Sequence, residues 1–178
     1  MRFRPFIGAL ALSLAFPALG IAQAQDSAAK QKLIALGTVS TDHRALINEI
    51  KQDLHVAEPV ILLIGPFEDK IWMGELFKEA GTAYVAIDQN FYRSLTDKEQ
   101  EAMIGHEMGH FIYTYIYPYL DDRIKFQLQA GADLFAAQYV GADAVLSWLG
   151  KTFPTDDDKE LAEYKWRKKV LGDFKQAF

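Results

Sequence analysis

Two histidines of this chain stand four residues apart, with a glutamate directly after the first, in His106-Glu107-Met108-Gly109-His110. An α-helix turns by about 100° per residue, so side chains at positions 106 and 110 share one face, roughly one turn apart. Two imidazole nitrogens placed in this way can bind one tetrahedral zinc ion. Glu107 lies beside that face and can take a proton from a water molecule on the metal. The segment therefore predicts a Zn2+ site with hydrolytic chemistry.

The helix that must carry this segment has a recognisable start. Thr96 and Glu99 form the pattern of a capping box, in which the hydroxyl accepts from the Glu99 amide and the carboxylate reaches back. We expect this helix to run from about residue 97 to about residue 116 and to stop before Pro118. Glycine costs about 1 kcal/mol relative to alanine inside a helix. We therefore interpret Gly109 as a point where another segment packs close beside the metal.

The third zinc ligand is less evident from the residues. Gln129 and Asp133 are four residues apart on the next predicted helix, about 119–140, and share one face. Asp133 could bind zinc directly or accept a hydrogen bond from a metal-binding histidine. Small apolar neighbours on the same helix indicate close packing and favour a role for Asp133 in the site. Gln129 could bind through its amide oxygen, although an amide is a poorer zinc ligand than a carboxylate.

Other segments predict the elements around these two helices. The apolar run from Pro59 to Gly65 predicts a buried strand, and Thr82 to Ile87 predicts a second one. The stretch 67–80 fits either an extended arm or a short amphipathic helix. The remaining expectations are a loose lead-in with a short helix over 25–40, a helix capped by Thr41 or Asp42 and running to about His55, a shorter helix over 142–149, and a charged tail with an apolar stripe from residue 156.

The stretch from Pro59 to Leu149 resembles the gluzincin metallopeptidases of the CAAX prenyl endopeptidase and HtpX type. In that family a strand leads into a capped helix with His-Glu-x-x-His, and a second helix carries Glu-x-x-Ala-Asp before a segment similar to Leu134–Gly141 of this chain. The first motif is the specific part of the resemblance. We expect an α+β fold, mostly helical and zincin-like, with a small sheet beside the metal helix. The expected activity is that of a zinc metalloendopeptidase acting on peptide or protein substrates.

The resemblance also assigns roles to individual residues. It implies that His106 and His110 bind the metal, that Glu107 is the general base, and that Asp133 orients a histidine. It implies further that the strand at 82–87 is the sheet edge along which an extended peptide binds. The family has a glutamate where this chain has Gln129. We rank Asp133 first as the replacement ligand, Gln129 second, and loss of activity close behind.

The departure at position 129 keeps a second function open. The chain could be a catalytically inactive metallopeptidase-like protein that acts as a zinc-binding or peptide-binding module. The intact Glu107 argues against this reading, since a binding module needs no base beside its first ligand. A zinc site with a purely structural role ranks lowest, because no fourth ligand has a recognisable spacing. Tyr113 or Tyr139 could stabilise an oxyanion, although such aromatic residues are more typical of a core.

Composition limits the classes of partner and of chemistry, and the first residues of the chain predict its compartment. The 178 residues include no cysteine, which excludes disulfides, thiolate ligands and a cysteine nucleophile. A net charge of −5 argues against nucleic acid as a partner. Residues 1–24 predict a signal peptide cleaved after Ala22-Gln23-Ala24, with no stable membrane insertion afterwards. We therefore expect one periplasmic or secreted domain over 25–178, with its core at about 41–150.

Overall fold

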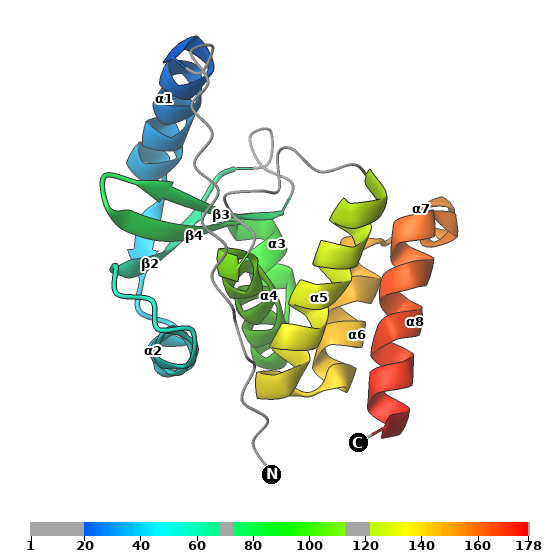
Figure 1. The fold of residues 1–178 in the computed structure, drawn as a ribbon. Helices are drawn as coiled ribbons and strands as arrows, with labels where there is room; N and C mark the ends of the chain where they lie inside the picture. The colour runs from blue at the N-terminus through cyan, green and yellow to red at the C-terminus, as the bar shows by residue number, and fades with distance from the viewer. Residues whose placement is uncertain (1–19, 68–72, 113–121, 178) are drawn as a thin grey trace.

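The structure is a computed structural model that describes residues 20–67, 73–112 and 122–177. Its fold is α+β and mostly helical, with one four-stranded sheet. Figure 1 shows how the helices lie around this sheet. Most of the predicted signal peptide lies outside the described residues. The elements in chain order are α1 Gly20–Leu36, β1 Thr38–Ser40, α2 Arg44–Asp53, β2 Val60–Gly65, β3 Gly74–Glu79, β4 Thr82–Asp88, α3 Gln89–Ser94, α4 Asp97–Gly109, the 3-10 turn His110–Ile112, α5 Asp122–Val140, α6 Ala142–Thr152, α7 Asp156–Glu160 and α8 Ala162–Ala177.

The sheet has the strand order β1-β2-β4-β3. Strands β2 and β4 confirm the two predicted strands and pair in parallel, with Leu62 opposite Val85. The two outer strands pair antiparallel to their neighbours. The expectation that the strand at 82–87 forms the sheet edge is wrong, because β4 is bonded on both sides. The edge beside it is β3, which turns into β4 through Ala80 and Gly81, both at positive φ (47° and 77°).

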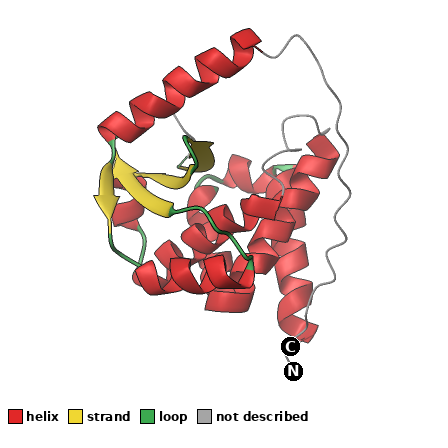
Figure 2. Cartoon of the chain, turned by 60° about the vertical axis from the view of Figure 1, so that its left-hand side comes forward, coloured by secondary structure: helices red, strands yellow, loops and turns green. Residues whose placement is uncertain are grey.

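The sheet lies between two layers of helix. Figure 2 shows α1 on one side of the strands and the other helices on the opposite side. Leu33 of α1 packs with Leu63, Phe77 and Ala86 in a small cluster on the first face. The second face packs against α2 and α4 in the main core, which continues into α5, α6 and α8. No helix in the described part of the chain is long and apolar enough to cross a bilayer.

Two helix boundaries differ from the prediction. The expected cap of α2 by Thr41 or Asp42 is wrong: the helix begins at Arg44, and His43 precedes it at a φ of 52° without a side-chain cap. The polar residues before it are used in the turn after β1, where the Asp42 amide bonds Ser40 Oγ. Helix α4 ends at Gly109 instead of continuing to about residue 116. The next three residues form a tighter 3-10 turn, a common way for a helix to end.

The segments on either side of the predicted core are more ordered than expected. The lead-in is the 17-residue helix α1 followed by β1, consistent with its alanine, glutamine and lysine content. The tail forms α7 and α8, and it packs on the domain. Leu171 is fully buried in the main core, and Tyr164 and Phe174 pack against that core. The core therefore extends well beyond residue 150.

Helices α4 and α5 meet along a seam of small residues. A Cβ atom built on Gly109 would lie 3.0 Å from the Cα of Ala132, and one on Gly105 would lie 3.1 Å from the Cβ of Ala136. The two backbones therefore approach as closely as glycine allows. This confirms the expectation that another segment packs tightly against Gly109. The seam sets the distance between the histidines on α4 and the polar residues on α5.

We expect Gly109→Ala to lower the free energy of unfolding by about 1–2 kcal/mol, because an inserted methyl group forces a closely packed backbone apart. Gly172→Ala on α8 is the matched control, because a Cβ there meets no atom within 4 Å. It should raise stability by about 0.5–1 kcal/mol through helix propensity alone. Urea unfolding of both variants provides the measurement. Equal stabilisation by the two alanines would show that the seam is loose.

The predicted capping box is present at the start of α4, and its carboxylate is also a crosslink. Glu99 Oε2 accepts from the Thr96 amide at 2.7 Å and from Lys151 Nζ at 2.7 Å, while Oε1 accepts from Ser147 Oγ at 2.7 Å. Burial would raise the pKa of Glu99, but these hydrogen bonds lower it to about 2. The group joins α4 to α6 and stabilises the fold while it is ionised.

Glu99→Gln should lower the free energy of unfolding by about 1–3 kcal/mol at pH 7, because it weakens charge-assisted hydrogen bonds. The folded-state pKa of about 2 lies below the ordinary value of 4.5. The contribution is therefore complete above about pH 4.5 and disappears as the pH falls toward 2. Urea unfolding should show a smaller difference from native protein at pH 3 than at pH 7. A difference that does not depend on pH would contradict this assignment.

Candidate functional site

The predicted histidines face each other at the end of α4. The Nε2 atoms of His106 and His110 lie 3.2 Å apart, and the two rings meet edge to face at an interplanar angle of 87°. His106 is 3% exposed. The ring of Trp148 from α6 also packs on His106, with 4.8 Å between the two ring centres. Helix periodicity therefore produces the expected pair, and the first ring is buried in contact with two other rings.

The two predicted polar residues of α5 contact different histidines. Asp133 is fully buried, and its Oδ1 lies 2.8 Å from Nδ1 of His106. This nitrogen is on the opposite side of the ring from the Nε2 that faces His110. Gln129 is hydrogen-bonded to His110. The i, i+4 spacing on α5 thus matches the same spacing on α4, with Asp133 behind one ring and Gln129 beside the other.

Arg167 of α8 is a member of this cluster that the sequence reasoning missed. Its Nε donates to Asp133 Oδ2 at 2.7 Å and its Nη2 donates to Oδ1 at 2.8 Å. The side chain is 3% exposed, and Nη1 also donates to Glu163 at 3.0 Å. The one signal in the sequence was a cation within the apolar stripe of the tail. That pattern does not indicate that the cation pairs with a residue 34 positions earlier.

Charge and burial act together on these groups. Burial lowers the pKa of His110, and the electrostatic effects of the neighbouring His106 and Arg167 side chains add to this, so that it falls to about 3. Burial would raise the pKa of Asp133, but Arg167 and His106 reduce it to about 2. Asp133 is therefore an ionised acceptor at neutral pH, and His110 carries no charge there. Both states are those that a histidine metal site requires.

Glu107 points toward the sheet edge. It is 7% exposed, and a Cβ atom built on Gly74 of β3 would lie 3.0 Å from its Oε1. Burial is the main reason that the pKa of Glu107 is raised above its ordinary value, and the nearby charge of Glu75 adds to it. A hydrogen bond from the Leu76 backbone opposes this shift. A carboxylate with a raised pKa, next to two histidines, is suited to proton transfer.

Tyr139, one of the two tyrosines considered for the oxyanion, does not enter this site. The Tyr139 hydroxyl donates to Asp53 Oδ2 of α2 at 2.9 Å, at an exposed position. Tyr113 lies outside the described residues.

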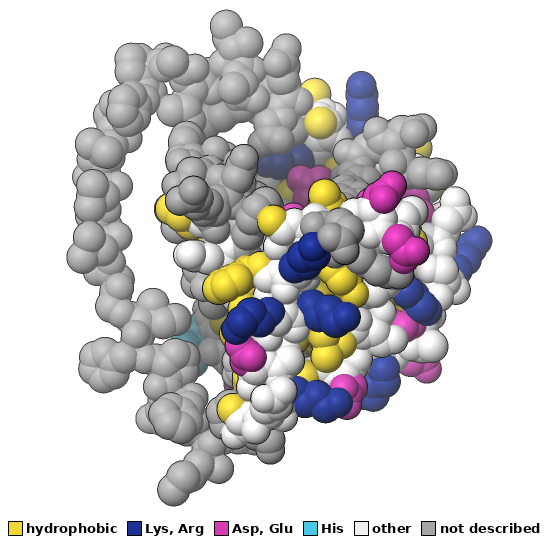
Figure 3. Space-filling view, turned by 90° about the vertical axis from the view of Figure 1, so that its right-hand side faces the viewer, with side chains coloured by type: hydrophobic (Ala, Val, Ile, Leu, Met, Phe, Trp, Pro, Cys, Tyr) yellow, Lys and Arg dark blue, Asp and Glu magenta, His cyan; other side chains and the backbone are white. Residues whose placement is uncertain are grey.

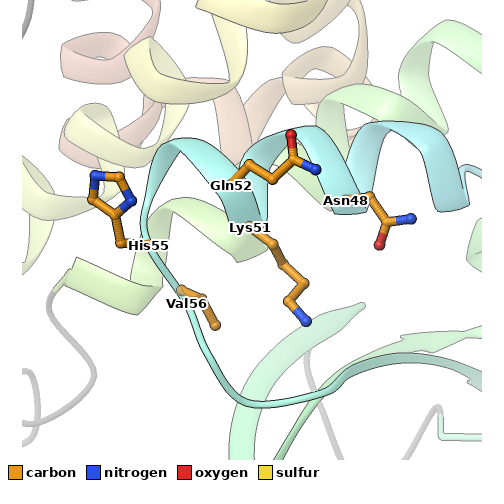
Figure 4. Close-up of a pocket in the computed structure, with 5 residues that line it drawn as sticks. All are labelled: Asn48, Lys51, Gln52, His55 and Val56. Atoms are coloured by element: carbon orange, nitrogen blue, oxygen red, sulfur yellow. The ribbon is translucent and has the colours of Figure 1, made fainter.

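A separate open hollow lies beside α2 (Figure 4). It is lined by Asn48, Lys51, Gln52, His55 and Val56. It contains none of the predicted site residues, and His55 is its one histidine.

Among the described residues, no three His, Cys, Asp or Glu side chains are grouped so that they could hold a metal ion. Within the part of the chain that the structure describes, a third ligand for a metal on the histidine pair would be of another type, and the Gln129 amide is the polar side chain bonded to His110. Scans of the chain against protein-family models find no match, and searches of the curated proteins and of the solved structures find none either. Function is therefore inferred from the side chains themselves.

Proposed function

We propose that this protein is a zincin-like zinc metallopeptidase related to the gluzincins, with His106, His110 and Gln129 as its metal ligands and Glu107 as its general base. The observation that carries the proposal is the 3.2 Å separation of the two Nε2 atoms. Two nitrogens at about 2.0–2.1 Å from a tetrahedral zinc lie roughly 3.3–3.4 Å apart. The pair therefore has nearly the spacing that zinc binding requires.

The contacts favour Gln129 over Asp133 as the third ligand, the reverse of the ranking from sequence. Both Asp133 oxygens accept from Arg167, and Oδ1 also faces His106 Nδ1. That nitrogen is the one that a metal-binding histidine uses to reach an orienting carboxylate. Gln129, in contrast, is bonded to the second histidine of the pair. The proposal therefore gives Asp133 the orienting role and Gln129 the metal.

Zinc bound at this position would make a water molecule more acidic and polarise the scissile carbonyl group. The chain's own contribution to the reaction is proton transfer and alignment. Glu107 takes the proton of the attacking water and later delivers it to the leaving amine. Its position beside Gly74 places it next to β3. We propose that an extended peptide binds along this edge by strand addition, with β3 in the role that the sequence assigned to residues 82–87.

The proposal includes the compartment expected from the sequence, because the first 24 residues have the pattern of a signal peptide. The alternative is a metallopeptidase-like binding protein without activity, and the neutral amide at position 129 favours it. The two functions share the metal and differ in the need for a base. Glu107 supports the enzyme, because burial raises its pKa above the ordinary value, and a general base benefits from such a shift.

The direct test is the zinc content of purified protein over residues 25–178. We expect about one zinc per chain and its loss in His110→Ala, because removing one of two histidine ligands opens the site. His55→Ala is the matched control, because His55 lies in the hollow beside α2. Inductively coupled plasma mass spectrometry after dialysis provides the count. Native protein that stays free of zinc after incubation with zinc would reject the proposed function.

A further inference from the structure

We infer that Arg167 is a positioning residue of this site, which acts on His106 through Asp133 and so makes α8 part of the metal centre. The inference rests on the proposed function. The guanidinium group donates to both Asp133 oxygens, at 2.7 and 2.8 Å. A bidentate pair of this kind fixes the plane of the carboxylate as well as its distance. Asp133 therefore presents Oδ1 to His106 in one fixed orientation.

The orientation of the Asp133 carboxylate decides which nitrogen of His106 is available to bind a metal. A neutral imidazole carries its proton on one nitrogen, and the other nitrogen has the lone pair that binds a metal. Asp133 Oδ1 lies 2.8 Å from Nδ1, so the carboxylate holds the proton there. Nε2 is then left with its lone pair facing His110. The orientation and tautomer of the first ligand thus depend on a carboxylate that Arg167 holds.

Arg167 is itself held firmly enough for this role. Its guanidinium carbon lies 5.5 Å from the ring centre of Trp148 and 5.8 Å from that of Phe153. Its Nη1 atom donates a hydrogen bond to Glu163. Trp148 also packs on the His106 ring. Arg167 therefore reaches His106 by two routes, through the carboxylate and through the indole.

The other cations of α8 have a different environment. The surface on the α8 side shows lysine and arginine side chains interspersed with acidic ones (Figure 3). Lys168, the next residue, is exposed and lies 5.7 Å from the ring centre of Tyr164. Arg167 is the cation of this helix that is turned inward and buried. The neighbouring pair thus offers a test residue and a control on the same turn.

The first test is Arg167→Lys, with Lys168→Met as the control. Lysine keeps a positive charge beside Asp133, so the fold is preserved, but it cannot make the bidentate contact. Removing a partner of this type typically weakens metal binding by about 10–100-fold. We expect the zinc dissociation constant, measured by competition with a chromophoric chelator, to rise about tenfold in Arg167→Lys and to stay unchanged in the control.

A double variant removes the carboxylate and the cation together, so that neither charge is left buried alone. If Arg167 acts through Asp133, then Asp133→Asn combined with Arg167→Met should bind zinc about as weakly as Asp133→Asn alone. The visible spectrum of the Co2+-loaded protein should change in the same way in both. Additive losses of affinity would overturn the proposed route through Asp133.

A readout without metal separates this inference from the function on which it rests. In metal-free native protein, long-range 1H–15N NMR spectra should show His106 with its proton on Nδ1, and Arg167→Lys should give a mixture of tautomers. If native protein binds zinc but neither tautomer nor affinity changes in the variant, Arg167 is only structural and the inference fails. If the tautomer shifts but native protein binds no zinc, the proposed peptidase fails and the positioning of His106 by Arg167 holds.

Discussion

Glu107→Gln is expected to reduce peptide hydrolysis by about 10²–10⁴-fold while the protein keeps its zinc. Glutamine has nearly the shape of glutamate and preserves the packing against Gly74, but it cannot take a proton from water. The loss should appear in kcat more than in KM, because proton transfer belongs to the transition state. Cleavage of an unfolded, fluorescently labelled protein, with zinc content measured on the same sample, provides both readouts.

Glu101→Gln is the matched control for this experiment. Glu101 is on the same helix, but its carboxylate bonds Lys98 and lies 3.7 Å from Nδ1 of His43, away from the histidine pair. Its replacement should leave kcat and zinc content unchanged. Activity that survives in Glu107→Gln would remove Glu107 from the mechanism. A native protein that holds zinc but cleaves no substrate would support the inactive binding protein instead.

Gln129→Glu is expected to tighten zinc binding, by about tenfold or more, because an anionic carboxylate is a better ligand for zinc than a neutral amide. Gln129 is bonded to His110, so the new carboxylate would be placed beside that ligand. Gln129→Ala should weaken binding strongly, since it leaves two protein ligands. Chelator competition at pH 7 provides the dissociation constants, and the series Ala, Gln, Glu should show increasing affinity.

Asp133→Asn tests the competing assignment in the same assay. Asparagine removes the charge that faces Arg167 but leaves the metal side of the site intact, so zinc binding should weaken by about 10–100-fold without being abolished. The opposite pattern would contradict the assignment of Gln129 as the third ligand. If Asp133→Asn abolished zinc binding and Gln129→Ala had no effect, Asp133 would be the third ligand, as the ranking from sequence had it.

The parts of the site that could be predicted from sequence depend on short spacings. The four-residue interval between His106 and His110 places both rings on one face in any regular helix. The capping box at Thr96 is equally local, and the structure confirms it. Strands β2 and β4 were recognisable because each is a short apolar run bounded by turn residues. In each case the cause lies within one turn or one strand.

The parts that could not be predicted depend on pairing between distant segments. Which strand lies at the edge of the sheet is decided by β3 adding to the outside of β4, and the apolar run of residues 82–87 contains no information about that. The role of Arg167 could not be predicted for the same reason, because its partner Asp133 is on another helix. The choice between Gln129 and Asp133 also required knowing which histidine each residue contacts.

The edge strand β3 has a consequence for how the protein behaves at high concentration. An open strand edge can pair with a second copy as readily as with a peptide, and such pairing is a common route to aggregation. Three of the six residues of β3 are charged, namely Glu75, Lys78 and Glu79. Parallel, in-register alignment of two such strands, as in a fibril, brings like charges close and makes that form of self-pairing unfavourable. These charges would allow β3 to accept a transient guest strand while discouraging fibril growth from the same edge.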